Sequence, residues 1–289
     1  MIELDAVWCA ANPIPLPDGD TSKDGRGRIL IVGGARDVPG ALLLTGEAAL
    51  RVGAGKVKLA TIASAAIALG VAFPEAAAVS LPEEDGDIAA AAIELLLPML
   101  ARVDAVVLGP GTGDKEATAR LVRGLADTDA PEVMLVLDAA AVACAGPLDA
   151  VLERWRGRIV MTPHQGEMAS LLDCDKDAVA ADPERAAADV ARRYGAVVAL
   201  KDAETVIAAP DGTMLHYAGG GVGLGTGGSG DVLAGVVGGL LARGLPPLVA
   251  AGWGVWLHGE AGGVLAKRIG PVGFLARELL PELPGLLAR

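Results

Sequence analysis

The sequence predicts one α/β domain with a three-layer α/β/α arrangement, in which helices cover both faces of a mostly parallel central sheet. From residue 28 onward, short apolar segments alternate with helical stretches, and strands separated in this way by helices form βαβ units with a parallel sheet. The 289-residue chain also holds 40 glycines, and only 3% of its residues are aromatic. Glycine at this density indicates many tight turns and close backbone approaches, which a helical bundle does not need.

The expected elements alternate along the chain. Apolar segments expected as strands are residues 28–32, 56–61, 78–81, 104–108, 133–137, 158–161 and 196–200. Helical stretches expected between them are residues 40–52, 87–100, 115–125, 166–172 and 183–194. Segments 205–209 and 214–217 are joined by Pro210-Asp211-Gly212 and predict a β-hairpin appended to the parallel sheet. Helices over 231–243 and 247–268 complete the expected domain.

Residues 1–25 are expected to form an N-terminal leader segment without regular elements, because Asn12-Pro13, Pro15 and Pro17 interrupt them. No long linker or internal repeat divides the rest of the chain, so residues 26–289 are predicted to form a single domain. The N-terminus lacks the basic region of a signal peptide. The longest apolar run, residues 59–73, is shorter than the roughly 20 residues that span a bilayer. We therefore expect no membrane association and a cytoplasmic location.

The charge balance limits the classes of partner. The formal net charge is −12, so a broad basic face for nucleic acid is not expected. An anionic ligand must then be held by a local device such as backbone N–H groups. The three cysteines, Cys9, Cys144 and Cys174, are scattered and predict neither a disulfide framework nor a protein-held metal site.

The strongest motif is the glycine-rich stretch 219–231, which leads directly into an apolar helix. Backbone N–H groups and the helix dipole together favour an anion at such a helix N-terminus. Gly227, Gly228, Ser229 and Gly230 would form this anion hole. Asp231 would lie in the first helical turn and could accept a proton from a hydroxyl held beside the phosphate. The alternative is a flexible loop in which Ser229 only caps the helix and Asp231 is an ordinary first-turn acid.

Polar residues and glycines also occur after several predicted strands, at the edge of the sheet where ligands bind in open α/β folds. The turn that holds Gly111 and Gly113 would let a ligand approach the backbone, or would simply be a tight turn. His164 would point into the strand-end crevice, either as a ligand contact or as a structural residue. Lys201 ends a buried strand and needs an anion, which a nucleotide phosphate, Asp202 or Glu204 could supply. Asp138 could order Mg²⁺ waters or cap a turn.

In this order, the motifs resemble those of the ADP/ATP-dependent NAD(P)H-hydrate dehydratases of the ribokinase-like superfamily. The resemblance runs from about Lys23 to Leu265 and corresponds to the C-terminal half of the bifunctional NAD(P)HX repair enzymes. It rests on the following segments: residues 27–34, 39–41, 51–55, 109–113, 137–139, 162–167, 200–201, 226–235 and 257–259. It implies that residues 26–289 form a single ribokinase-like dehydratase domain. The resemblance does not extend to an epimerase half, so none is expected in these 289 residues.

The resemblance implies a repair reaction and a set of roles. The family transfers a phosphoryl group from ADP or ATP, with Mg²⁺, to the C6 hydroxyl of NAD(P)H hydrate, and loss of phosphate restores NAD(P)H. Asp231 corresponds to the catalytic acid–base residue and Gly230 to the anion-hole glycine. The implied nucleotide-binding residues are Lys201, Asp202, Ala203, Glu204, Thr205 and Gly230. The implied contacts to the hydrate are Ala41, Gly111 or Gly113, His164 and Asp231. The resemblance also implies a homo-oligomer, a tetramer.

The chain departs from the usual family pattern at four positions, which are Ala140, Gln165, Asp202 and Gly221. Two alternative functions therefore stay open at this point. One is a ribokinase-like kinase that phosphorylates the hydroxyl of a vitamin precursor or sugar. The other is a catalytically silent homologue that binds nucleotide without turnover.

Overall fold

A computed structural model describes residues 1–128 and 132–288 of the chain. Residues 129–131 and 289, which the predicted domain includes, lie outside the described part. The sheet strands are β1 (Ile2–Glu3), β2 (Arg28–Val32), β3 (Lys56–Ile62), β4 (Ala77–Leu81), β7 (Ala105–Leu108), β8 (Met134–Leu137), β9 (Ile159–Met161), β10 (Val197–Leu200), β11 (Thr205–Ala208) and β12 (Met214–Tyr217). A separate small hairpin pairs β5 (Glu83–Glu84) with β6 (Asp87–Ile88).

The helices alternate with these strands as the sequence predicts. They are α1 (Ala6–Ala11), α2 (Ala41–Arg51), α3 (Ala63–Ala72), α4 (Ala92–Leu100), α5 (Lys115–Ala126), α6 (Ala140–Ala143), α7 (Asp149–Leu152), α8 (Gln165–Leu172), α9 (Lys176–Ala181), α10 (Pro183–Tyr194), α11 (Ser229–Ala242), α12 (Pro247–Arg268), α13 (Ala276–Leu279) and α14 (Leu283–Leu287). None of these described helices is long and apolar enough to cross a bilayer.

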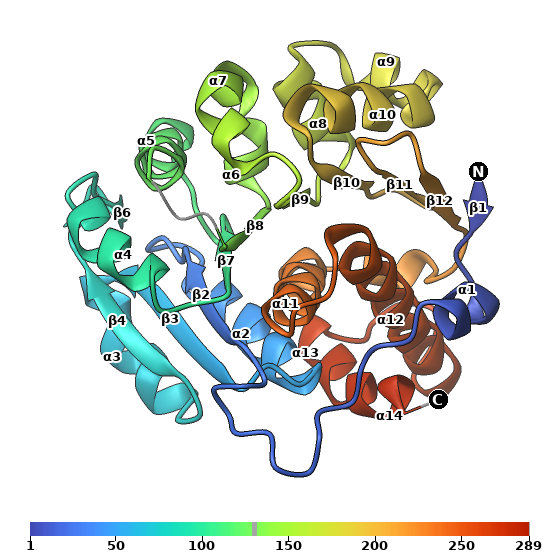
Figure 1. Ribbon diagram of the computed structural model, residues 1–289, viewed down its shortest axis with the longest axis horizontal. Coiled ribbons are helices and arrows are strands. Elements are labelled where there is room, and N and C mark those ends of the chain that lie inside the picture. Colours follow the sequence, from blue (N-terminus) through green and yellow to red (C-terminus); the bar gives the residue numbers. More distant parts are fainter. Residues whose placement is uncertain (129–131, 289) are drawn as a thin grey trace.

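The sheet order is β1-β12-β11-β10-β9-β8-β7-β2-β3-β4 (Figure 1). The neighbouring strands in the part of the sheet ordered β10-β9-β8-β7-β2-β3-β4 pair in parallel. Strand β11 is antiparallel to both β10 and β12, and β1 pairs in parallel with β12. The prediction of a mostly parallel sheet with an appended hairpin is therefore confirmed. Because β7, β8, β9 and β10 are parallel, their carboxyl ends lie at one edge of the sheet, and this edge carries the candidate site.

Alternate residues of the strands face two separate hydrophobic cores. Ile31 and Val107 belong to the core under α2, α11 and α12, whereas Leu30 and Val106 belong to the core under α4, α5 and α10. This alternation results from the two-residue period of a strand, and it places helices on both faces of the sheet. The predicted three-layer arrangement is confirmed.

A glycine-lined seam joins α11 to α2. A Cβ atom on Gly235 would lie 2.2 Å from the backbone oxygen of Thr45, and one on Gly239 would lie 2.7 Å from Val52. A Cβ atom on Gly238, on the sheet side of the same helix, would lie 2.4 Å from Val107. The absence of side chains at these positions lets the backbones of α11 and α2 approach closely, so the N-terminus of α11 is held at a fixed place against α2.

Three sequence-based expectations about elements were wrong. The N-terminal segment is not free of regular structure, because Ile2–Glu3 extends the sheet and Asp5 caps α1 by accepting from the N–H groups of Val7 and Trp8. The helix expected from residue 87 begins only at Ala92, because Asp85 and Gly86 both have positive φ and turn the chain into the β5–β6 hairpin. The apolar run over residues 59–73 contains an unexpected helix, α3, after the end of β3.

Candidate active site

The loops after β2 and β7 meet where the order of the strands reverses. From β2 the chain moves outward to β3 and β4, then returns to the other side of β2 as β7. The N–H of Ala35 donates to the carbonyl oxygen of Gly111 at 2.7 Å. Gly111 has a φ of +65°, and a Cβ there would lie 2.8 Å from Cβ of Ala41. Ala41 and Gly111 therefore pack side by side at the point where the strand order reverses, which is where open α/β sheets bind ligands.

Gly113 lies in the same loop and is held by a carboxylate. Its N–H donates to Oδ1 of Asp87 at 3.2 Å, and the N–H of Asp114 donates to Oδ2 of the same residue at 3.1 Å. Asp87 belongs to the unexpected β6 strand. The small hairpin thus fixes the backbone of the loop that holds Gly111 and Gly113.

The N-terminus of α11 faces the carboxyl ends of the central strands. Gly228 precedes the helix with a φ of +89°, and a Cβ there would lie 2.5 Å from a methyl group of Leu44 in α2. Ser229, the first residue of the helix, is only 4% exposed. Because the first N–H groups of a helix have no acceptor within it, this end of α11 can donate to an anion.

Asp231 lies in the first turn of α11 and is an unusual carboxylic acid. Burial, with a further contribution from the nearby negative charge of Asp138, raises its pKa to about 7, while the positive charge of Lys201 acts in the opposite direction. A carboxyl group with this pKa is partly ionised near neutral pH, so it can accept or return a proton there. Both the helix position and the pKa suit the role of a general base.

Lys201 and Asp138 form an ion pair beside Asp231. Nζ of Lys201 lies 3.1 Å from Oδ1 of Asp138, whose side chain is 4% exposed, and Oγ1 of Thr162 donates to the same oxygen at 2.6 Å. Burial alone would lower the pKa of Lys201, but the charges of Asp138, Glu167 and Asp231 outweigh it and raise that pKa. The lysine therefore stays charged. A Cβ on Gly230 would lie 3.4 Å from Nζ, which places the ammonium group at the N-terminal end of α11.

His164 follows β9 and caps the N-terminus of α8. Its Nδ1 accepts from the N–H of Gly166 at 2.9 Å and from the N–H of Glu167 at 3.2 Å, while Glu167 accepts from the N–H of His164 at 2.8 Å. Nε2, on the other side of the ring, lies 3.4 Å from Oε1 of Glu167, and the His164 side chain remains 60% exposed. His164 thus has a structural role, and its position at the cavity leaves the ring available to a ligand as well.

A cavity of about 670 Å³ lies along this edge of the sheet. Its walls are the end of β10, the loop before α11, the first turn of α11 and one side of α12. The lining residues are His164, Lys201, Asp202, Ala203, Thr205, Tyr217, Gly219, Gly221, Val222, Leu224, Gly225, Thr226, Ser229, Gly230, Leu233, Val255, His258 and Gly259. Its size suits a nucleotide, and Lys201 with the N-terminus of α11 supplies positive potential at one end.

The structure brings most of the expected nucleotide-binding residues to this cavity, but the side chain of Glu204 is directed elsewhere. Oε2 of Glu204 lies 2.7 Å from Nε2 of His216, and Nδ1 of His216 lies 3.3 Å from Oε2 of Glu3 in β1. Hydrogen bonds to Glu204 and Glu3 raise the pKa of His216 despite its partial burial. Gly227 is exposed, and no atom lies within 4 Å of a Cβ built on it.

Comparison with known proteins identifies the family. A family model described as NAD(P)H-hydrate dehydratase matches residues 29–285, which is most of the chain and includes every site residue described above. The chain belongs to the NAD(P)H-hydrate dehydratase family. The predicted resemblance is therefore confirmed.

Relatives that consist of the dehydratase alone and relatives with a second activity both match. The chain is 48% identical to the ADP-dependent (S)-NAD(P)H-hydrate dehydratase of Xanthomonas campestris over 99% of this chain and 96% of that protein. It is 39% identical to the bifunctional NAD(P)H-hydrate repair enzyme Nnr of Moorella thermoacetica over 98% of this chain. The matched part is 53% of that enzyme, so the chain spans about half the length of its bifunctional relative.

A solved dehydratase shares the fold. The ADP/ATP-dependent NAD(P)H-hydrate dehydratase of Bacillus subtilis, co-crystallised with ATP and Mg²⁺, superposes with a TM-score of 0.81 at 26% identity. The match covers 100% of this chain and 98% of that one. The fold is ribokinase-like, as the sequence predicts.

Two of the departures from the dehydratase pattern contact each other. Nε2 of Gln165 donates a hydrogen bond to Oδ2 of Asp202. Asp202 is exposed and Gln165 is half-buried, and the contact joins the start of α8 to the loop after β10. The carboxylate of Asp202 is thus engaged by Gln165 at the mouth of the cavity.

Sequence reasoning missed several residues of the cavity. Tyr217 donates to Oε1 of Glu260 at 3.1 Å, and its ring packs against Gly219 and Gly259. The sequence predicts a structural role for His258, because it has no partner at metal-ligand spacing. In the structure, Nε2 of its ring lies 2.8 Å from Oγ of Ser229. Only the Leu257-His258-Gly259 string of the family resemblance pointed to this position, because nothing local to α12 indicates a partner 29 residues away.

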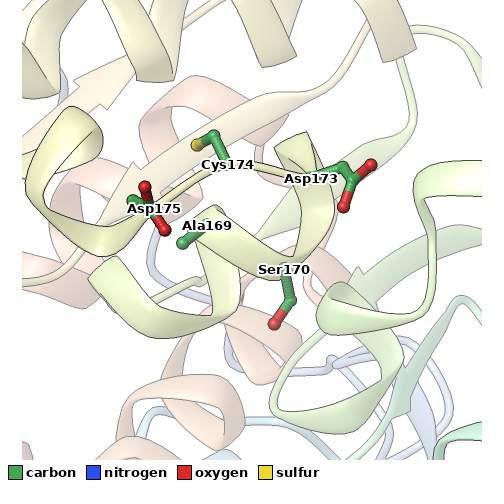
Figure 2. Close-up of a pocket in the computed structure, with 5 residues that line it drawn as sticks. All are labelled: Ala169, Ser170, Asp173, Cys174 and Asp175. Carbon is green, nitrogen blue, oxygen red and sulfur yellow. The ribbon is translucent and has the colours of Figure 1, made fainter.

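A second depression, of about 460 Å³, lies at the C-terminal end of α8 (Figure 2). It is lined by Ala169, Ser170, Asp173, Cys174 and Asp175. His164 is at the opposite end of the same helix. Two carboxylates in the lining make this depression less suited to an anionic nucleotide than the cavity beside Lys201.

Proposed function

We propose that the protein dehydrates the S epimer of NAD(P)H hydrate with ADP as phosphoryl donor. The main support for this proposal is the placement of Asp231, whose pKa is raised to about 7, in the first turn of α11. The chain is also 48% identical to a protein named ADP-dependent (S)-NAD(P)H-hydrate dehydratase. A second relative, 35% identical and from Neisseria meningitidis, has the same name. The preference for ADP and for the S epimer rests on these two relatives.

The residues support a two-step reaction. Asp231 takes the proton of the C6 hydroxyl as its oxygen attacks the β-phosphorus of ADP, and AMP leaves. The N–H groups of the first turn of α11 and the charge of Lys201 stabilise the negative charge on the transferring phosphoryl group. The C6–O bond then breaks and phosphate departs with its electrons, the ring nitrogen donates its lone pair, and the neighbouring carbon loses a proton, which gives NAD(P)H.

The two ligands would approach α11 from different sides. The nucleotide fits the cavity beside Lys201, and we place the hydrate beside Ala41 and Gly111, where the strand order reverses. Asp231 would lie between them, because it is close enough to Lys201 for their charges to interact, and a Cβ on Gly228, just before α11, would lie 2.5 Å from Leu44 of α2, the helix that begins at Ala41. In-line transfer needs the attacking oxygen within about 3–3.5 Å of phosphorus, so both ligands must meet at this turn.

Mg²⁺ and a homotetramer are further proposals from family resemblance, and a cytoplasmic location is a further proposal from the sequence. Within residues 1–128 and 132–288, no group of three or more His, Cys, Asp or Glu side chains is placed to hold a metal ion. This arrangement fits Mg²⁺ carried mainly by nucleotide phosphates and water, as is common for this ion. Asp138 is the buried carboxylate near that position. When bound, Mg²⁺ would neutralise phosphate charge.

The direct test is turnover with defined substrates. The purified protein is mixed with S or R NADH hydrate, MgCl₂ and either ADP or ATP, and the appearance of the NADH absorbance band is followed. We expect NADH, AMP and phosphate with the S epimer and ADP. A stable phosphorylated product without NADH would instead indicate a kinase, and nucleotide binding without any product would indicate a silent homologue.

The pH dependence should track the ionisation of Asp231. Because the base must be ionised, kcat/KM for the nucleotide should fall as pH decreases through about 7. Asp138→Asn removes the charge that helps to raise the pKa of Asp231. The acidic limb of the pH profile, along which kcat/KM falls as pH decreases, should therefore move to lower pH. Asp149→Asn, which removes a surface carboxylate paired with Arg193, should leave the limb in place. A limb that does not move in Asp138→Asn would contradict the assignment of the limb to Asp231.

Asp202 should have little effect on nucleotide affinity. Its carboxylate is exposed and hydrogen-bonded to Gln165, so we expect Asp202→Gly to change the dissociation constant of ADP by less than about threefold. Isothermal titration of the two proteins measures this. A tenfold or greater tightening in the glycine variant would show that Asp202 opposes the phosphates.

A further inference from the structure

The nucleotide cavity has a half-buried histidine in its wall that the proposed chemistry does not use. His258 belongs to α12, which packs along α11 (Figure 1). Its Nε2 lies 2.8 Å from Oγ of Ser229, and both residues line the cavity. Ser229 is 4% exposed and is the first residue of α11. This contact therefore touches the turn that would hold the phosphates.

The backbone of Ser229 is already occupied. Its N–H donates to the carbonyl oxygen of Thr226 at 3.2 Å, within the glycine-rich loop. The N–H groups of Gly230 and Asp231 come next, at positions of the first turn that have no acceptor within a helix. The hydroxyl is thus the group through which Ser229 can donate to an anion, and its direction depends on His258.

His258 is neutral under ordinary conditions. Burial, together with the positive charge of Lys201, lowers its pKa to about 4, although a hydrogen bond with the backbone of Ser229 acts in the opposite direction. A neutral imidazole carries one N–H donor and one acceptor nitrogen. Nε2 can therefore act toward Oγ of Ser229 either as a donor or as an acceptor, depending on which ring nitrogen carries the proton.

The direction of the Oγ–Nε2 hydrogen bond decides what Ser229 can do. If Nε2 accepted, the only hydroxyl proton would point at the ring and the oxygen lone pairs would face the phosphates. If Nε2–H donates, the hydroxyl proton is free to turn into the anion-binding turn. Anionic phosphate favours the second arrangement, because it places a donor rather than an acceptor beside the negative charge.

We infer that His258 is a positioning residue, which donates from Nε2 to Oγ of Ser229 so that the serine hydroxyl donates to a phosphate of the bound nucleoside diphosphate. The inference deepens the proposed function and rests on it, because it concerns the same nucleotide site. According to this inference, the Ser229 hydroxyl joins the backbone N–H donors of α11, and His258 of α12 sets the orientation of that hydroxyl.

The test is a double-mutant cycle on ADP affinity, measured by isothermal titration. We expect Ser229→Ala and His258→Leu each to raise the dissociation constant about tenfold, which is typical of losing a hydrogen bond to a charged group. The double variant should be no weaker than Ser229→Ala alone, because His258 acts only through the hydroxyl. If His258→Leu weakened ADP binding by the same factor in the wild-type protein and in the Ser229→Ala variant, the inference would be overturned.

Two conservative variants keep the test independent of folding. Gln places an amide N–H near the position of Nε2, whereas Asn places one near Nδ1. His258→Gln should retain ADP affinity within about threefold, and His258→Asn should resemble His258→Leu. Equal affinities for Gln and Asn would overturn the inference even if His258→Leu does not fold.

The measurement also separates this inference from the proposed function. ADP binding requires no hydrate, so a wild-type protein that binds ADP but forms no NADH would contradict the dehydratase reaction and leave the cycle intact. Conversely, the wild-type protein could dehydrate the hydrate normally while the two substitutions had additive effects on the free energy of ADP binding. That result would support the dehydratase reaction and reject the role of His258. A wild-type protein that does not bind ADP would contradict both.

Discussion

Asp231→Asn is expected to lower kcat by about 10²–10⁴ while ADP still binds, because an amide keeps the shape of the side chain but cannot take a proton. The position of Asp231 in the first turn of α11 and its pKa of about 7 are the reasons for this expectation. Single-turnover kinetics with S NADH hydrate, together with titration of ADP, would measure the two effects separately.

A matched control distinguishes the loss of the base from a general disturbance of the site. Asp149→Asn makes the same chemical change at a surface carboxylate that pairs with Arg193, and its kcat should equal that of the wild type. If Asp231→Asn retained wild-type kcat, Asp231 would be excluded from proton transfer. If it lost ADP binding as well, its role would be in shaping the anion-binding turn.

Gly235→Ala should destabilise the fold by about 1–3 kcal/mol, because overpacking a tight interface has this cost. The new Cβ would lie 2.2 Å from the backbone oxygen of Thr45, so α11 and α2 must move apart. The free energy of unfolding in urea measures this change. Since α11 also carries the anion-binding turn, we expect turnover to fall at temperatures where the variant is still folded.

Gly263→Ala is the control for this second prediction. Gly263 is also helical, in α12, and no atom lies within 4 Å of a Cβ built there. The same substitution should stabilise the protein by about 0.5–1 kcal/mol, because glycine weakens a helix relative to alanine. Equal effects at the two positions would show that the close approach of α11 to α2 does not depend on glycine.

The parallel strands were predictable because their signals are local. Each of the expected parallel strands from β2 to β10 is an apolar run bounded by turn residues, and their observed bounds differ from the predicted ones by one residue at most. The errors arose where two signals competed. Asp85 and Gly86 form a hairpin turn beside a stretch whose composition predicts a helix, and α3 continues an apolar run without the periodicity that marks an amphipathic helix.

The candidate site was predictable only as a set of separate turns. Glycine density before α11 and polar residues after strands indicated where a ligand could bind. The contacts that give these residues their properties join distant parts of the chain. The ion pair of Lys201 with Asp138 spans 63 residues, and the contact of Gln165 with Asp202 spans 37. No local pattern encodes such partners, so neither the raised pKa of Asp231 nor the contact of His258 could be derived from sequence.

The position of the N-terminal helix gives the protein a built-in optical reporter. Trp8 of α1 packs against Gly252 of α12, Nε1 of Trp253 donates to the carbonyl oxygen of Asn12 at 2.6 Å, and Trp256 packs edge-on against Trp253 with ring centroids 5.4 Å apart. Three of the four tryptophans therefore surround the place where the first twelve residues dock. Their fluorescence emission would shift to longer wavelength if this segment detached, whereas Trp155, buried on the other face of the sheet, would report only global unfolding.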